Sequence, residues 1–284
     1  MIFAHIIGGL GNQMFQYALT RSLANRNGGN FSLDVSDFEL YKLHKYCLSQ
    51  LSIVERVAPP DIGQWHRRRQ GRKAALTRFL PPWKKIKFIK ETNRDFNPRI
   101  LTMTGDVYLE GYWQSEKYFS NIRNVLLKEF APKNLDERAR ASAALIANAD
   151  CPVSIHVRRG DYVSNKTTNQ FHGTCDLEYY RRAAALINDR FTNPHYFVFS
   201  DDMAWSKQNM VLGDKVTYID GNLNHEDLHL MSLCRHNIVA NSSFSWWGAW
   251  LNDHHDKVVI APKSWYLECA AESSDLVPKT WRRI

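Results

Sequence analysis

Residues 2–34 read IFAHIIGGLGNQMFQYALTRSLANRNGGNFSLD, and their pattern decides how the chain begins to fold. The apolar run 2–7 predicts a strand, and the glycine-rich stretch 8–11 ends it. Apolar residues then recur at helical spacing until the Asn-Gly-Gly of 27–29 stops the helix. A second apolar run, at 31–34, predicts another strand. A strand, a helix and a strand in this order predict the opening of a parallel-sheet α/β domain.

The second half of the chain alternates between strand and helix patterns more regularly than the first. Pro132 and an alanine-rich helix expected at 136–149 mark the passage between them, so we predict domains 1–135 and 136–284. Strands separated by helices of this length predict a parallel, doubly wound sheet, and hence two Rossmann-like halves. The other expected elements are strands at 107–109, 153–157, 196–199, 216–219, 238–240 and 258–260, and helices at 116–130, 177–191, 203–210, 225–235 and 244–252.

Composition limits the class of protein. The chain has 284 residues, of which 44% are hydrophobic, 23% charged and 12% aromatic, enough apolar surface for a substantial folded core. Its five cysteines, at 47, 151, 175, 234 and 269, form no CxxC pair, which predicts reduced thiols. The N-terminal apolar run lacks a basic leader, and no run approaches the roughly 20 apolar residues of a membrane-spanning helix. We therefore expect a cytoplasmic protein.

The net charge of +8 is concentrated in a basic segment at 62–90. This segment holds ten Lys or Arg and no acidic residue, so the rest of the chain carries −2 (8 minus 10). Flanking aromatic residues such as Trp65 and Phe88 suit a peripheral arm on an anionic lipid surface or a lipid-diphosphate carrier. A solvated helical hairpin broken at Pro81-Pro82 explains the same charges. Nucleic-acid binding is disfavoured, because no RNA- or DNA-binding motif carries them.

The densest polar cluster is SIHVRRGDY at 154–162, at the end of an expected buried strand. Ligands of open α/β sheets bind at the carboxyl ends of the strands. Strand alternation places His156 and Arg158 on one face and Arg159 on the other. We assign Arg158 to an anionic ligand, because guanidinium forms bidentate bonds to phosphate, and we expect Arg159 to pair with Asp161 or to cap backbone. A structural salt-bridge corner is the alternative for both arginines.

Two further polar clusters follow expected strands. NSSFSWWG at 241–248 precedes a helix, where hydroxyls and free N–H groups form an anion site or simply cap the helix. Three serines in four positions favour the anion site. The Ser-Asp-Asp of 200–202 suits either a divalent metal or a helix start, and spacing does not separate the two. No histidine lies near it in sequence, so a transition-metal site is poorly supported.

The glycine turn at 8–12 is an incomplete dinucleotide motif, because GxGxxG needs glycine where Met14 stands. No GxxxxGK[ST] phosphate loop occurs either. Close approach of a ligand to the backbone and a tight strand-to-helix connection explain the turn equally well. The incomplete motif therefore argues against a dehydrogenase, and tight NADH binding is the observation that would favour one.

Four motifs resemble the α-1,2-fucosyltransferase family, glycosyltransferase family 11. They are GGLGNQMFQYA at 8–18, HVRRGDY at 156–162, SDD at 200–202 and NSSFSWWGAW at 241–250, in the family's order. The resemblance extends from residue 8 to about residue 262. It implies a GT-B architecture, in which two Rossmann-like domains face each other across a cleft and the C-terminal one binds GDP-fucose. It also implies inversion at the fucose anomeric carbon, with GDP-fucose as donor substrate and no metal or other cofactor.

The resemblance also implies roles for individual residues. Arg158 corresponds to the arginine that holds the donor diphosphate, and His156 is expected beside the GDP. Ser243 and Ser245 are expected to complete the phosphate site, and Asp201 or Asp202 to fix the nucleotide or its loop. The other expected donor-site residues are Asn241, Ser242 and Phe244 in the C-terminal domain and Gly9, Gly11, Asn12 and Gln13 in the N-terminal glycine turn.

The chemistry of transfer sets further requirements. Negative charge builds on the β-phosphate as the C–O bond to GDP breaks, and Arg158 with the serine-rich helix start stabilises it. The acceptor hydroxyl gives its proton to a carboxylate or histidine within hydrogen-bond reach. No motif identifies this base: Asp161 and Glu110 are candidates by position, a salt-bridge role is the alternative for each, and a dissociative reaction needs no strong base. Trp113 and Gln114 are the candidate acceptor contacts.

We therefore expect transfer of fucose from GDP-fucose to the 2-hydroxyl of a terminal galactose during synthesis of an O-antigen or another surface glycan. The expected partners are GDP-fucose and a β-galactoside acceptor, including one linked to a lipid diphosphate, with peripheral contact to the inner face of the membrane. A transferase with another donor or linkage is the first alternative, and preference for UDP would favour it. A nucleic-acid-binding protein built on segment 62–90 is the second, and predicts salt-sensitive binding.

Overall fold

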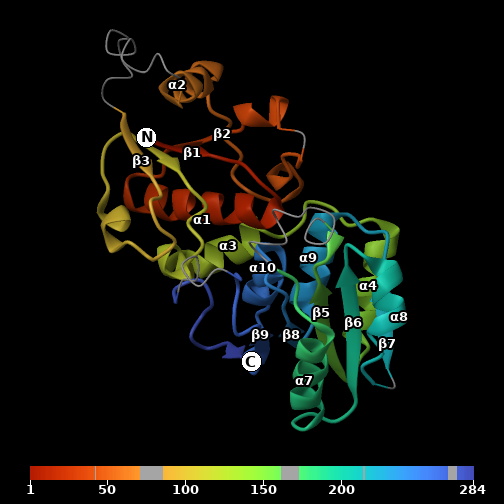
Figure 1. The fold of residues 1–284 in the computed structure, drawn as a ribbon. Helices are drawn as coiled ribbons and strands as arrows, with labels where there is room; N and C mark the ends of the chain where they lie inside the picture. Colours follow the sequence, from red (N-terminus) through yellow and green to blue (C-terminus); the bar gives the residue numbers. More distant parts are fainter. Residues whose placement is uncertain (42, 71–85, 161–172, 214, 268–273) are drawn as a thin grey trace. The chain divides into compact units, whose positions relative to one another are not determined.

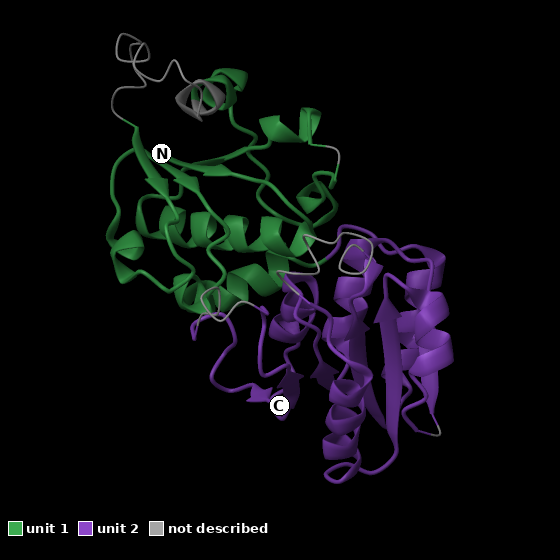
Figure 2. Cartoon of the chain, viewed as in Figure 1, with its two compact units in different colours: residues 1–131 green, residues 132–284 purple. Residues whose placement is uncertain are grey.

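The computed structural model describes residues 1–41, 43–70, 86–160, 173–213, 215–267 and 274–284, with only the backbone of 66–70. Figure 2 shows two compact units, residues 1–131 and residues 132–284. Each unit is built on one parallel sheet. The domain boundary expected from the sequence, 135/136, lies just inside the second unit, before its first helix, α4 (Glu137–Ala147).

Unit 1 is built on a four-stranded sheet in the order β2-β1-β4-β3. Helix α1 (Leu10–Arg26) follows β1 directly, and thirteen of its 17 residues are buried, so it is the central helix of the unit (Figure 1). The predicted strand, helix and strand at the N-terminus are confirmed. The four strands are β1 (Ile2–His5), β2 (Phe31–Asp34), β3 (Lys87–Lys90) and β4 (Val107–Glu110).

Short helices complete unit 1. Helix α2 (Pro60–Gln70) packs on β3 and β4 through Trp65, whose ring centroid lies 6.2 Å from that of Phe88 and 5.4 Å from that of Tyr108. Trp65 is 7% exposed, so this aromatic residue of the basic segment belongs to a small core. The other helices are η1 (Ser36–Glu39), η2 (Leu48–Gln50), η5 (Pro98–Thr102), η6 (Glu116–Tyr118), η7 (Ser120–Ile122) and α3 (Arg123–Glu129).

Two elements of unit 1 differ from the sequence prediction. The single helix expected at 116–130 is wrong: two 3₁₀ turns precede α3, because Phe119, at φ −145° and ψ 4°, leaves helical geometry between them. Strand β3 was not predicted. It is an edge strand in which the two lysines are exposed and only Phe88 and Ile89 turn partly inward, too short an apolar run to indicate a strand.

Unit 2 holds a six-stranded sheet in the order β10-β9-β8-β5-β6-β7 (Figure 1). The chain enters at the buried central strand β5, adds β6 and β7 on one side, and returns to the other side for β8, β9 and β10. The order therefore reverses between β5 and β8, the kind of switch point at which doubly wound sheets bind ligands. The strands are β5 (Cys151–Val157), β6 (Pro194–Ser200), β7 (Val216–Ile219), β8 (His236–Ile238), β9 (Val259–Ala261) and β10 (Arg282–Arg283).

The predicted elements of unit 2 are confirmed, with ends that differ by no more than three residues. The exception is β10, a two-residue strand of exposed arginines that pairs with β9 and was not predicted. Helix α10 (Ser243–Leu251) is apolar apart from its two serines, and Trp246 and Trp247 are fully buried in it. The remaining helices of the unit are α7 (Leu177–Asn188), α8 (Met203–Asn209), α9 (Asn224–Leu233) and α10 (Ser243–Leu251).

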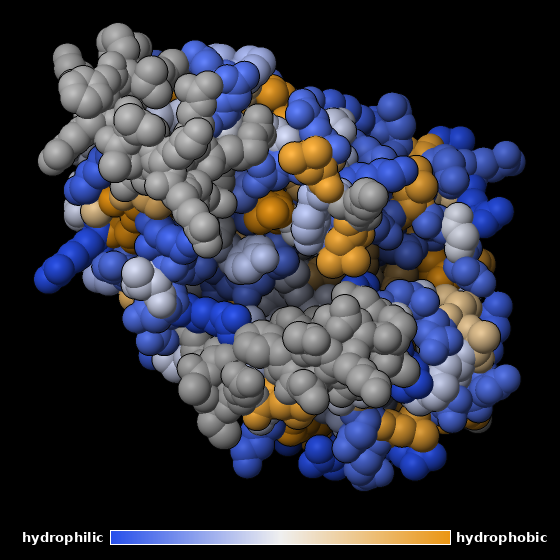
Figure 3. Space-filling view, turned by 45° about the horizontal axis from the view of Figure 1, so that its top comes forward, coloured by the Kyte–Doolittle hydropathy of each residue, from blue (hydrophilic) through white to orange (hydrophobic). Residues whose placement is uncertain are grey.

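The described surface is mainly hydrophilic on the face shown in Figure 3, with separate apolar areas. Leu40, Leu43 and Val211 are the most exposed large apolar residues, and isolated residues of this kind are ordinary on protein surfaces. In the ranges that the structure describes, no helix is both long and apolar enough to cross a membrane. The four cysteines in those ranges are free thiols, as predicted, and Cys269 lies outside them.

Candidate functional site

The polar residues singled out in unit 2 gather at the carboxyl edge of its sheet. Strands β5 and β6 pair so that Val157 lies opposite Ser200, and the residues after each strand, 158–160 and 201–202, are therefore neighbours. On the other side of β5, strand β8 leads through 239–242 into helix α10. The candidate site thus lies where the strand order reverses.

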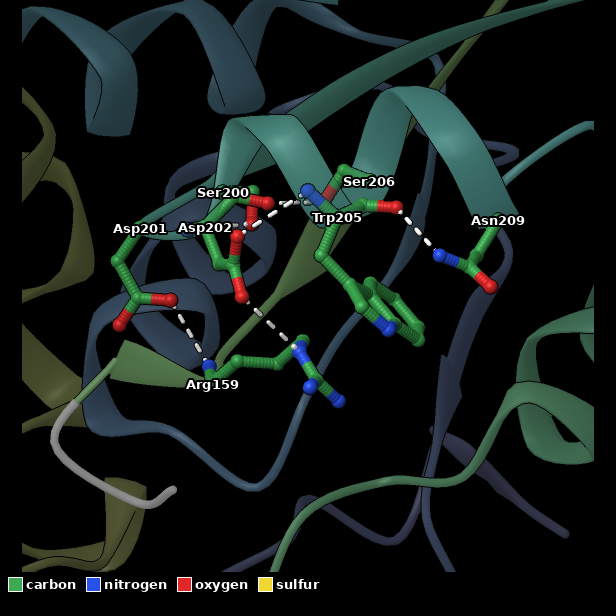
Figure 4. Close-up of polar contacts among 7 residues, drawn as sticks. All are labelled: Arg159, Ser200, Asp201, Asp202, Trp205, Ser206 and Asn209. Carbon is green, nitrogen blue, oxygen red and sulfur yellow. Dashed lines mark hydrogen bonds and ion pairs between the residues drawn. The ribbon is translucent and has the colours of Figure 1, made fainter. Parts of the chain in front are cut away.

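Arg158 is paired with Asp201. Its Nη1 lies 3.0 Å from Asp201 Oδ2, and both side chains are about a quarter exposed. The other carboxylate oxygen, Oδ1, accepts a hydrogen bond from the backbone N–H of Arg159 at 2.8 Å (Figure 4). One carboxylate therefore holds both the side chain of Arg158 and the backbone of the next residue.

Arg159 points elsewhere, as the strand alternation predicts. Its Nε lies 3.3 Å from Asp202 Oδ2, and its guanidinium carbon lies 4.0 Å from the ring centroid of Trp205 (Figure 4). Asp202 also caps α8, because its Oδ1 accepts the backbone N–H of Trp205 at 3.1 Å. The expected partner of Arg159, Asp161, lies outside the described residues, and the partner that the structure places beside it is Asp202. Arg159 thus ties the end of β5 to the start of α8.

His156 is buried under this edge, with 4% of its surface exposed. Its ring centroid lies 5.4 Å from that of Phe244 at the start of α10. Burial, and then the nearby positive charge of Arg158, lower the pKa of His156 to about 3. Its Nδ1 makes no hydrogen bond within the described ranges. At neutral pH the residue is therefore an uncharged imidazole beside the switch point.

Some side chains of residues 241–245 form hydrogen bonds within the protein, and others are partly exposed. Asn241 Nδ2 donates to two backbone carbonyls, those of Gly173 and Trp265, at 3.2 and 3.3 Å. Ser242 Oγ accepts the backbone N–H of Phe244 and so caps α10. The hydroxyl of Ser245 donates to carbonyls of the preceding turn at 3.4 and 3.3 Å.

Ser243 is different from the two serines beside it. It is partly exposed, and in the described part of the chain no hydrogen bond of its hydroxyl is found. Of the three predicted serines, Ser242 and Ser245 are therefore used by the fold, whereas the hydroxyl of Ser243 has no such bond within the described residues and is open to a ligand. Phe244 is also partly exposed. The first turn of α10 presents these two side chains at a helix N-terminus, which favours an anion.

The glycine turn of unit 1 is held together by its own side chains. Gly8 has φ +85°, and its carbonyl accepts a hydrogen bond from Gln13 Nε2 at 2.7 Å. Gln13 is fully buried and also binds the carbonyl of Lys45 and the N–H of Cys47. Gly11 is buried inside α1, whereas Gly9 caps its start without a side chain. Gln13 is thus a structural residue of this turn, and in this conformation its side chain is not a contact for the donor substrate.

Asn12 and Gln114 bind each other. Gln114 Nε2 donates to Asn12 Oδ1 at 2.8 Å, which joins the glycine turn after β1 to the loop after β4. The two residues were predicted on the donor and acceptor sides respectively. Because they are in contact, the two residues lie together at the carboxyl edge of the sheet in unit 1.

The loop after β4 corrects one acceptor prediction. Trp113 is 3% exposed, and its ring meets Tyr118 edge-on at 6.0 Å, so it offers no free ring face to a sugar. Its φ of +57° is unusual for a large residue. The carboxylate of Glu91 holds this turn by accepting the backbone N–H groups of Tyr112 and Trp113 at 2.7 and 3.0 Å. Burial raises the pKa of Glu91, and these hydrogen bonds oppose the rise.

Of the two candidate bases, the structure describes one. Glu110 Oε1 lies 2.6 Å from the ammonium of Lys90, which gives it the salt-bridge role considered as its alternative. Asp161 lies outside the described residues. No group of three or more His, Cys, Asp or Glu suited to a metal ion occurs within the described ranges. The carboxylates of Asp201 and Asp202 are instead engaged with the two arginines.

Comparison with known proteins decides the class of this chain. The sequence pattern of the family described as Glycosyl transferase family 11 matches residues 3–284. The chain belongs to glycosyltransferase family 11. This confirms the resemblance seen in the four motifs, and it leaves the dehydrogenase and nucleic-acid alternatives without support.

Several known proteins match this chain over most of its length. The alpha-1,2-colitosyltransferase of Escherichia coli is 33% identical over 300 residues, which cover 100% of this chain and 99% of that protein. The O-antigen biosynthesis glycosyltransferase WbnK of Escherichia coli is 30% identical over 311 residues, with 99% of each chain covered. The galactoside alpha-(1,2)-fucosyltransferase 2 of Sus scrofa is 29% identical over 257 residues, covering 86% of this chain and 68% of that protein.

A solved structure shares the fold of this family 11 member. The NodZ alpha-1,6-fucosyltransferase, in a crystal soaked with GDP-fucose, matches with a TM-score of 0.50 at 13% identity, covering 88% of this chain and 91% of that chain. The predicted fold class, α/β of the GT-B type with Rossmann-like domains, is confirmed. The protein is a glycosyltransferase whose relatives include α-1,2-fucosyl- and colitosyltransferases.

Proposed function

We propose that this glycosyltransferase moves fucose from GDP-fucose to the 2-hydroxyl of a terminal galactose, with inversion at the anomeric carbon. The observation that carries the proposal is the position of Arg158. Its guanidinium lies at the switch point of the unit 2 sheet, on the edge where α10 begins, and is fixed there by Asp201. A planar guanidinium beside a helix N-terminus suits a diphosphate, which offers paired oxygens and negative charge.

The same geometry explains how the leaving group would be stabilised. Charge grows on the β-phosphate as the glycosidic bond to GDP breaks, and a fixed cation in a partly buried site stabilises that charge better than water does. Arg158 supplies the cation, and Ser243 supplies a hydroxyl at the first turn of α10. His156 contributes an uncharged imidazole, so it adds hydrogen-bonding capacity beside the GDP without adding charge. In this proposal the reaction proceeds without a metal.

A transfer assay tests the proposal. Purified protein in EDTA is given GDP-fucose and a β-galactoside, GDP release is followed, and the product linkage is read by NMR. We expect an α-1,2-linked fucosyl galactoside. A product with another linkage, no transfer to any galactoside, or a strict need for a divalent metal would contradict the proposal.

The role of Arg158 has its own test. Arg158→Lys keeps the charge and loses the planar fork, so we expect kcat to fall by about 100-fold or more while the fold is retained. Near-normal turnover of this variant would remove Arg158 from the diphosphate site.

A second candidate donor, GDP-colitose, is suggested by the 33% identity to an alpha-1,2-colitosyltransferase over 100% of this chain and 99% of that protein. Colitose is fucose without the 3-hydroxyl group. A site that hydrogen-bonds this hydroxyl discriminates strongly against the sugar that lacks it, whereas a site that merely leaves room for it does not. The ratio of kcat/KM for GDP-fucose and GDP-colitose therefore separates the two donors. We expect GDP-fucose to be preferred, and preference for GDP-colitose would replace it in the proposal.

The acceptor is proposed to be part of a growing surface glycan, including one carried on a lipid diphosphate. The relative WbnK, named for O-antigen biosynthesis, supports this class of acceptor. Peripheral contact with the inner face of the membrane through the basic segment 62–90 belongs to the same proposal. Residues 71–85 of that segment lie outside the described residues, so a binding experiment carries the test. We expect salt-sensitive sedimentation with anionic vesicles and none with neutral vesicles.

A further inference from the structure

Asp201 makes two contacts with the segment that follows β5, one with each carboxylate oxygen. Oδ2 lies 3.0 Å from Arg158 Nη1, and Oδ1 accepts the backbone N–H of Arg159 at 2.8 Å (Figure 4 shows the second contact). An arginine side chain has several rotatable bonds, and a carboxylate partner fixes both its rotamer and the plane of its guanidinium. The hydrogen bond from the backbone N–H of Arg159 also fixes the main chain next to Arg158.

The neighbouring Asp202 is occupied with a different task. Its Oδ1 caps α8 at Trp205, and its Oδ2 pairs with Arg159, which lies over the Trp205 ring. Each of the two consecutive aspartates therefore serves one of the two consecutive arginines. Asp202 and Arg159 anchor the loop, whereas Asp201 holds the arginine assigned to the diphosphate.

Gly160 provides the space that Asp201 occupies. A Cβ on residue 160 would lie 2.8 Å from Asp201 Oδ2, closer than real Cβ atoms come, and 3.1 Å from its Cγ, tighter than most such contacts. Oδ2 is the same oxygen that pairs with Arg158. The backbone of Gly160 has no positive φ, so alanine fits the chain locally but displaces the carboxylate.

We infer that Asp201 is a positioning residue for transfer: it aims Arg158 at the leaving diphosphate, and glycine is needed at position 160 to let it do so. The inference rests on the proposed function. Asp201 acts through Arg158, and its own negative charge lies next to the anion site. Its removal therefore weakens stabilisation of the charge that grows on the β-phosphate during bond breaking more than it weakens binding of the intact GDP-sugar, in which that charge has not yet developed.

The experiment compares two test variants with two matched controls. Asp201→Asn removes the charge of the pair, and Gly160→Ala displaces the carboxylate while keeping it. Asp256→Asn breaks another Asp–Arg pair, with Arg235, which precedes β8 at the amino end of the sheet. Gly213→Ala adds a Cβ whose neighbour among the described residues is the ring of Tyr196, at an ordinary 3.6 Å.

For each protein, kcat and the KM for the donor are measured with GDP-fucose or GDP-colitose, whichever the wild type uses, and binding of GDP to the wild type is measured by calorimetry. We expect Asp201→Asn and Gly160→Ala to lower kcat by about 30-fold or more, with the KM for the donor changed by less than about 3-fold. Both controls should stay close to the wild type. Thermal melting establishes that each variant folds, and if Asp201→Asn does not fold, Gly160→Ala carries the test.

Three results would overturn the inference. If the folded test variants turn over as fast as the controls, Asp201 does not position Arg158. If the KM for the donor rises by as large a factor as kcat falls, Asp201 contributes to binding of the donor itself. If the wild type uses neither GDP-sugar and does not bind GDP, the proposed function fails and the inference falls with it. An active wild type with active variants, by contrast, refutes the positioning role alone.

Discussion

The burial of His156 has a measurable consequence for stability at acidic pH. The folded protein holds this imidazole with a pKa of about 3, against 6.5 in the unfolded chain. Between these values the unfolded state binds a proton that the folded state does not, so stability falls as pH falls. At pH 5 the unfolded imidazole is almost fully protonated, 1.5 pH units below its pKa. Each pH unit below that pKa corresponds to about 1.4 kcal/mol. The burial of neutral His156 therefore lowers the free energy of unfolding at pH 5 by about 2 kcal/mol relative to neutral pH.

Urea denaturation at pH 7.5 and pH 5.0, followed by tryptophan fluorescence, measures this cost. We expect His156→Gln to lose about 2 kcal/mol less than the wild type between the two pH values. His236, whose pKa burial lowers to about 4, adds to the same acid loss, so the comparison must be between variants. His255→Gln, at an exposed position, is the matched control and should lose as much as the wild type. An NMR titration in which His156 protonates near pH 6.5, or equal losses in all three proteins, would refute the assigned burial.

Three further substitutions test contacts within the two units. Gly248→Ala places a Cβ about 2.9 Å from the Cβ of Met231 between α10 and α9, and should cost about 1–3 kcal/mol in a denaturation experiment, whereas a neutral result would mean that the helices separate freely. Asn252→Ala removes a buried amide that donates three hydrogen bonds, and we expect a loss of about 2–3 kcal/mol, visible as a lower urea midpoint at unchanged slope. Gln13→Ala frees the backbone at 45–47, which should become a new site of limited proteolysis; an unchanged cleavage pattern would show that other contacts hold this loop.

Most of the sheet in unit 2 could be predicted because its inner strands are largely buried on both faces. Such strands appear in the sequence as continuous apolar runs, and helices of ordinary length separate them. The strands that were missed, β3 and β10, lie at sheet edges and are two to four residues long. Their stability comes from backbone pairing with a neighbour, which leaves no signal in the side chains.

The candidate site could be predicted to the level of residues but not of contacts. Arg158 and Asp201 were both expected at strand ends, yet their pairing depends on the register that sets Val157 opposite Ser200. The number of serines likewise could not show that two of the three hydroxyls form hydrogen bonds with backbone groups of their own turn. Glu91 was missed because it follows the unpredicted strand β3, and only the pairing of β3 with β4 brings it to the turn at 111–113.

The most direct test of the central claim is calorimetric binding of GDP to the purified protein in EDTA, with UDP and NADH as controls and Arg158→Lys as the matched variant. We predict that GDP binds selectively without a metal, and that the variant binds it more weakly. Equal binding of GDP and UDP, an absolute requirement for a divalent metal, or undiminished binding by Arg158→Lys would contradict the placement of the donor diphosphate at Arg158 on the carboxyl edge of the unit 2 sheet.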